Sequence, residues 1–136
     1  MKALFTILLL LSLIPPLSRA EDSPLEGKMQ ILARGLKKLS QQGTDPAKQA
    51  ENISLLKSLK MAAEEAKLLE PRMTEDISAD RKEKFLSDYR AQMDRLAGTF
   101  GEIEAAVRAG DYSKVTPLLG TLKSERKEGH DQFKKD

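Results

Sequence analysis

Hydrophobic residues recur at helical spacing along most of the chain, and turn signals divide them into four stretches. The first stretch opens at Ser23-Pro24, which is typical of a helix start because serine caps the first turn and proline suits the first helical position. Its apolar seam consists of Leu25, Met29, Leu32, Leu36 and Leu39. This spacing predicts a helix that ends at Gly43, where we expect the left-handed conformation that glycine adopts most easily.

The second stretch opens in the same way, at Asp45-Pro46. Its apolar seam consists of Ile53, Leu56, Leu59, Ala63, Ala66 and Leu69. Pro71 predicts the end of this helix, because proline cannot continue the backbone hydrogen bonding. The segment 72–80 has no sustained hydrophobic period, which indicates the longest loop between helices.

The third stretch predicts a helix over about 79–109, closed by Gly110. Its seam consists of Phe85, Tyr89, Met93, Leu96, Phe100, Ile103 and Val107. Gly98 and Gly101 lie inside this helix, where they either weaken it or let a neighbouring helix approach closely. Both alternatives stay open at the level of sequence.

Asp111 caps the fourth stretch, which carries Val115, Leu119, Leu122, Arg126, His130 and Phe133 on one face. Pro117 lies at its sixth position, where proline removes a hydrogen bond and kinks a helix. Either one kinked helix starts at Asp111, or 111–115 form a separate turn and Thr116 is the true cap. Four helices with mostly short connections predict an all-α, antiparallel, up-down-up-down four-helix bundle.

The first 20 residues have the pattern of an export signal. Lys2 supplies a positive charge, residues 3–14 are largely apolar, and Ser18-Arg19-Ala20 offers a cleavage site. The apolar run is too short to cross a bilayer, which takes roughly 20 helical residues. We therefore expect cleavage after Ala20 (a signal peptide over 1–20) and a mature four-helix domain over 21–136 without a membrane anchor.

Cleavage would change the charge balance of the protein. The chain has 23 basic and 21 acidic residues, and loss of Lys2 and Arg19 leaves equal numbers of both. A neutral domain without a basic run is a poor candidate for nucleic acid, since that affinity depends on neutralising phosphates. Cysteine is absent, which excludes disulfides, thiolate metal ligands and covalently attached c-type haem.

The predicted topology brings the two ends of the mature chain to the same end of the bundle. Met29 lies early in the first helix and His130 late in the fourth, both on apolar faces. A thioether and an imidazole that converge across an apolar slot are ligands suited to a low-spin haem. Each has a simpler interpretation as well, because methionine often fills core gaps and a histidine near a helix C-terminus complements the helix dipole.

The residues around this pair resemble the soluble periplasmic cytochrome b-562 family, a familiar example of the up-down-up-down bundle. At the start of the chain the resemblance covers Leu25-Glu26-Gly27-Lys28-Met29, Leu32 and Leu36. At the end it covers Gly110, Leu122-Lys123, Arg126, His130 and Gln132-Phe133. The resemblance implies a periplasmic electron carrier that binds one haem b (iron) non-covalently through Met29 and His130.

The resemblance also implies roles for residues around the haem. A family phenylalanine that packs on the porphyrin corresponds to Phe85 or to Tyr89. Arg126 matches a family arginine next to the haem, although its alkyl chain could equally cover the apolar seam. Independently of the resemblance, Lys134 lies one turn after His130, where it would either neutralise a haem propionate or remain solvated.

Catalysis by side chains has little support in the sequence. There is one histidine, and no glycine-rich phosphate loop or nucleophile elbow occurs. We therefore expect no enzyme. The resemblance implies electron exchange with redox partner proteins, which the sequence does not identify, and we expect a monomer. The alternatives are a haem-free exported bundle that binds a protein partner, and a haem carrier without a stable redox role.

Overall fold

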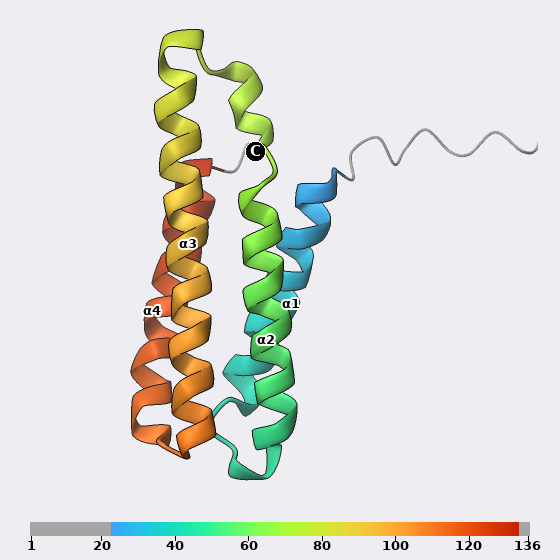
Figure 1. Cartoon of the computed structure of the whole chain (residues 1–136), viewed down its shortest axis with the longest axis vertical. Coiled ribbons are helices and arrows are strands. Elements are labelled where there is room, and N and C mark those ends of the chain that lie inside the picture. The colour runs from blue at the N-terminus through green and yellow to red at the C-terminus, as the bar shows by residue number, and fades with distance from the viewer. Residues whose placement is uncertain (1–22, 134–136) are drawn as a thin grey trace, which may run out of the picture.

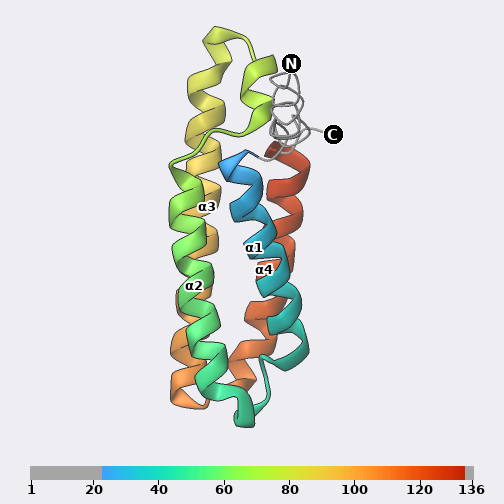
Figure 2. The same cartoon turned by 90° about the vertical axis from the view of Figure 1, so that its right-hand side faces the viewer.

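The computed structural model describes residues 23–133, which form four helices that run antiparallel to one another (Figure 1, Figure 2). The helices are α1 (Pro24–Gln42), α2 (Gln49–Lys67), α3 (Ala79–Ala109) and α4 (Tyr112–Phe133). Two 3₁₀ helices, η3 (Pro46–Lys48) and η4 (Arg72–Asp76), lie in the connections before α2 and α3. The predicted four-helix bundle is confirmed. The export signal, its cleavage site and Lys134 lie outside the described residues.

The ends of α1 and α3 follow the sequence signals in position. The Ser23 hydroxyl accepts a hydrogen bond from the Glu26 N–H at 3.2 Å, and Gly110 ends α3 with a left-handed φ of 69°. Gly43 follows α1 as predicted, but its φ of −61° is right-handed, so the predicted conformation is wrong. A Cβ at Gly43 would lie 3.4 Å from the Leu119 side chain, which indicates that this end of α1 lies beside α4.

The second helix differs from its prediction at both ends. The Asp45 carboxylate accepts a hydrogen bond from the Ala47 N–H at 2.9 Å and so caps η3, and the α-helix begins only after this 3₁₀ turn. At the other end, α2 stops at Lys67, four residues before Pro71. The segment predicted as a loop over 72–80 contains η4, which stands beside the first turns of α3, above the end of α2 (Figure 1).

The fourth helix is continuous from Tyr112 to Phe133 and includes Pro117. A separate turn over 111–115 is therefore wrong. Pro117 removes one backbone hydrogen bond and crowds the carbonyl four residues earlier, but the helix continues through it.

The core is formed by the predicted seams, and its packing is uneven around the bundle. Each helix packs on the next one along the chain, whereas α1 and α4 make little contact. A Cβ added at Gly35 would overlap the Leu59 side chain, so glycine allows α1 to approach α2 closely. Sequence left close approach open at Gly98 and Gly101. An added Cβ would have no atom within 4 Å at Gly98 and would meet only Lys60 Nζ of α2, at 3.9 Å, at Gly101, so neither glycine is needed for a close helix contact. Within residues 23–133, no helix has the length and apolar character needed to span a bilayer.

Candidate functional site

A cavity of about 520 Å³ opens between α1 and α4, with α3 behind it. This volume lies within the range of small-molecule sites, roughly 300–1,000 Å³. We call it the α1–α4 slot. Its lining includes Leu25, Met29, Leu32 and Leu36 from α1, Tyr89, Gln92, Met93 and Leu96 from α3, and Glu125, Arg126, Gly129, His130 and Phe133 from α4. The slot exists because the side of the bundle between α1 and α4 is not closed by helix packing.

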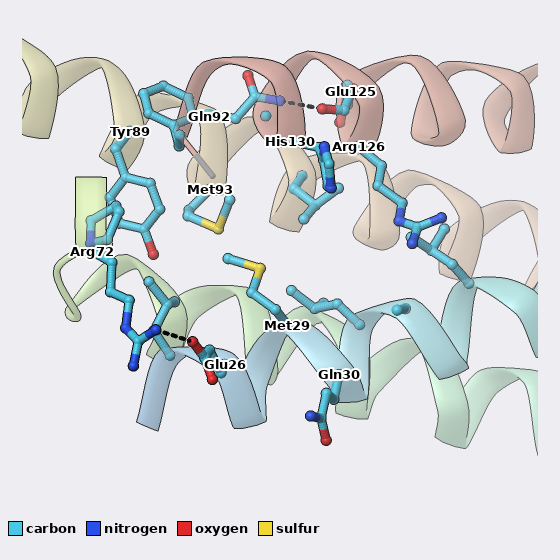
Figure 3. A pocket seen from close by; sticks show the side chains of 18 of the residues that line it. Glu26, Met29, Gln30, Arg72, Tyr89, Gln92, Met93, Glu125, Arg126 and His130 are labelled. Atoms are coloured by element: carbon cyan, nitrogen blue, oxygen red, sulfur yellow. Dashed lines mark hydrogen bonds and ion pairs between the residues drawn. The ribbon is translucent and has the colours of Figure 1, made fainter. Parts of the chain in front are cut away.

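Met29 and His130 reach the slot from opposite walls (Figure 3). The Met29 side chain comes from α1 and is half-buried among the apolar residues. The His130 side chain comes from α4 and remains 50% exposed. The sequence placed both on buried faces, and the structure instead places the imidazole at the mouth of the slot. The difference arises because little of α1 covers the last turns of α4.

The structure separates the two aromatic candidates. Tyr89 lines the slot, its hydroxyl donates a hydrogen bond to the Ala66 carbonyl, and burial raises the pKa of this hydroxyl to about 12. Phe85 is not among the lining residues, and its ring packs edge-on against Phe133 with centroids 5.3 Å apart. Phe133 lines the slot, so Phe85 supports the wall from outside.

Met93 is a slot residue that the sequence analysis did not single out. It is 5% exposed, and Figure 3 shows its thioether directed towards that of Met29. Its position one turn after Tyr89 on the same seam was a signal that could have identified it. The slot therefore contains two thioethers and one imidazole.

A polar group in the wall was missed as well, because no sequence pattern indicated it. Glu125 Oε1 accepts a hydrogen bond from the Thr99 hydroxyl at 2.7 Å, and the Glu125 carbonyl accepts one from Gln92 Nε2 at 2.6 Å. Glu125 Oε2 is buried without a hydrogen-bond partner among the described residues. Burial raises the pKa of this carboxyl, partly opposed by the hydrogen bond from Thr99 and the charge of Arg95.

Arg126 lies at the border of the slot. Its side chain extends from α4 towards α1 (Figure 3), and the residue is exposed. This placement fits both interpretations of Arg126, since its alkyl chain covers the seam while its guanidinium lies beside the slot. Of the five candidate residues, Met29, Tyr89, Arg126 and His130 therefore come together and Phe85 does not.

The slot offers a thioether and an imidazole from facing helices, which is a donor set for an iron porphyrin. Within 23–133, no three His, Asp or Glu side chains converge to hold a bare metal ion. The apolar lining around Leu32 and Leu96 suits the flat, largely apolar body of such a group. The residues present therefore fit a haem better than an isolated cation.

Comparison with known proteins shows the family of this chain. The family model for cytochrome b562 matches residues 24–134, which is most of the chain. No curated protein and no solved structure gives a significant match. The matched region contains all four helices and therefore both Met29 and His130. This chain is a member of the cytochrome b562 family, whose proteins are haem-binding electron carriers.

Proposed function

We propose that this protein carries single electrons and binds one haem b non-covalently, with Met29 and His130 as the axial ligands. The observation that carries the proposal is that both side chains enter one slot from α1 and α4, two helices that hardly touch (Figure 3). Family membership supports haem binding, and the ligand pair comes from the chemistry of these two residues.

The residues that line the slot would have two different roles. Met29 and His130 would hold the group from two sides, while Tyr89 and Met93 would form the buried wall on α3. Bound haem iron would supply one-electron redox chemistry. Because Met29 and His130 would both coordinate the iron, no coordination position would remain for a substrate. We therefore propose that the protein is not an enzyme.

We also propose that the protein is exported to the periplasm after cleavage of residues 1–20, and that it acts as a monomer. The charge, apolar and small-residue pattern of the N-terminal segment supports export. Mass spectrometry of the protein recovered from the periplasm tests this directly. A mature N-terminus at Glu21 is expected, and an intact Met1 in the cytoplasm would contradict it.

Variants of the two ligands test the haem proposal. His130→Ala should weaken haem binding by more than about 100-fold, because even partners outside the metal's own ligands are worth roughly 10–100-fold in affinity. Met29→Ala should leave one axial position open and lower the reduction potential, since a methionine ligand raises it. Haem titration, absorption spectra of the reduced protein and potentiometry measure these effects.

The matched control is Met61→Ala, because Met61 is an exposed methionine on α2 and is 59% exposed. It should keep the parent spectrum, affinity and potential. If Met29→Ala and His130→Ala also keep them, the ligand assignment is wrong. A protein that ignores added haem would favour the haem-free bundle, and rapid transfer of haem to apomyoglobin without electron exchange would favour a haem carrier.

A further inference from the structure

A second groove lies beside the α1–α4 slot and has a volume of about 550 Å³. Its charged residues are Arg34 and Lys37 from α1 and Lys123 and Arg126 from α4. All four are exposed, and no acidic residue lines the groove. We call these four residues the basic groove.

The four cations of the basic groove lie together, with no acidic residue among the residues that line it. None of its four cations forms an ion pair with another residue of 23–133. The neighbouring Lys38, one residue after Lys37, is instead paired with Glu51 at 2.7 Å. The whole chain has a formal net charge of only +2. Positive potential is therefore concentrated at this groove, because like charges in a recess reinforce one another.

The basic groove continues directly from the slot. Ala33, Leu36 and Arg126 line both. A molecule that binds along the groove would therefore lie next to the slot and span α1 and α4, which face the same side of the bundle in Figure 2. A redox partner must reach this side to approach a group held between Met29 and His130.

We propose that the basic groove docks the acidic surface of a redox partner protein. This inference rests on the proposed electron-transfer function. Redox complexes bury small interfaces, typically below 1,200 Å², and rely on electrostatic steering for fast encounter, which four unpaired cations beside the slot would supply. Duplex nucleic acid fits less well, because binding proteins commonly neutralise about 6–10 phosphates.

Two triple variants with the same charge change test the proposal. The groove variant is Arg34→Gln, Lys37→Gln and Lys123→Gln, and it spares Arg126 because that residue also lines the slot. The control variant is Lys57→Gln, Lys60→Gln and Lys82→Gln, which are exposed on α2 and α3. Each variant loses three positive charges, so a general effect of net charge appears in both.

The first measurement uses the haem-loaded protein and two small redox probes in stopped flow. With anionic hexacyanoferrate, the groove variant should react about tenfold more slowly than the parent at low ionic strength, whereas the control changes less than about twofold. With cationic hexaammineruthenium, the groove variant should not be slower. In 1 M salt the difference should vanish, because the screening length falls to about 3 Å.

The second measurement needs no haem. A poly-glutamate peptide added to the protein without haem should shift backbone amide NMR signals at 33–40 and 123–126, and these shifts should disappear in the groove variant alone. If haem does not bind but these shifts occur, the groove remains an acidic-protein site and the electron-transfer function fails. If haem binds normally and neither probe distinguishes the two triples, the docking proposal is overturned.

Other ligands of the basic groove would give different results in these measurements, and any of those results would overturn the proposal. If succinate shifts the same amides at the same concentration as the peptide, the groove takes small anions. If the groove variant loses more than about tenfold in haem affinity, the groove holds the haem propionates. If a DNA duplex or anionic lipid vesicles bind at 0.15 M salt and the peptide does not, the partner is not an acidic protein.

Discussion

Glu125 shows how a single side chain in the slot wall is governed by its surroundings. Its carboxyl lies between α3 and α4, where Thr99 satisfies one oxygen and the other has no partner. Burial penalises the charged form and raises the pKa of the group. The protonated form supplies a donor that the charged form lacks. The neutral form of the Glu125 carboxyl is therefore more favoured in the slot wall than it would be in water.

Replacing Glu125 with glutamine should stabilise the protein as the pH rises. Below about pH 4.5 the carboxyl is protonated in both the folded and the unfolded chain. As the pH rises above 4.5, the unfolded chain ionises first because the folded pKa is raised, so the parent loses stability relative to Glu125→Gln. We expect a gain of less than about 1 kcal/mol at pH 7, since the group is partly exposed and screened by solvent.

Thermal unfolding of both proteins between pH 4 and pH 8 measures this difference. The control is Glu64→Gln, which removes the same charge from an exposed position of α2. A gain that is equal at all pH values would show that the ionisation of Glu125 is not its cause.

At the scale of the helices, glycine has different roles at positions that look alike in the sequence. Gly35 lies where α1 meets α2, and the fully buried Leu59 occupies the space that a Cβ would need. Gly98 lies on α3 with no atom within 4 Å of an added Cβ. The first glycine permits helix packing, whereas the second only lowers the helix propensity of α3.

Alanine at these two positions should have opposite effects on stability. Gly35→Ala should destabilise the fold by about 1–3 kcal/mol, because the extra methyl group overpacks the α1–α2 contact. Gly98→Ala should stabilise it by up to about 1 kcal/mol through helix propensity. Urea unfolding followed by circular dichroism measures both. Equal and favourable effects would mean that Leu59 moves aside and that the contact is not tight.

In the four-helix bundle, three pairs of helices pack against each other, and the side between α1 and α4 stays open. The consecutive pairs α1–α2, α2–α3 and α3–α4 form the core, and the slot and the basic groove both lie on the remaining side. Polar contacts secure the opposite end: Asn52 is fully buried, donates to the Gln42 carbonyl and accepts from the Gln42 side chain, each at 2.8 Å. At the other end, Met29 and His130 lie on α1 and α4, which make little contact with each other, so fewer helix contacts hold these two segments.

Hydrogen exchange should report this asymmetry. Without haem, amides in the first two turns of α1 and the last two turns of α4 should exchange faster than those in the middle of α2 and α3, since fewer packed neighbours protect them. Haem at about 100 times its dissociation constant should slow them by up to about 100-fold, which corresponds to 2.7 kcal/mol of binding. His130→Ala with haem is the control and should show little slowing. Uniform exchange along all four helices would contradict the asymmetry.

The sequence by itself determined the helices and which chain ends meet. The seam over 79–109 predicted α3 at its observed bounds, because hydrophobic periodicity and a glycine cap act locally. The turn signals were less reliable at Asp45, where a 3₁₀ helix precedes the α-helix, and at Pro117, where the helix continues. In both places the alternative backbone conformations differ little in free energy. Met29 and His130 could be paired because antiparallel topology alone brings their helix ends together.

Only the tertiary structure decided which side of the bundle stays open and what lines it. Contacts between helices distant in sequence decide that His130 is half-exposed, that the Met93 thioether is directed towards Met29, and that Oε2 of Glu125 is buried. The same holds for Arg34 and Lys123, which share a groove although 89 positions separate them in the chain. Periodicity fixes the face of one helix, whereas a cavity is a property of several helices packed together.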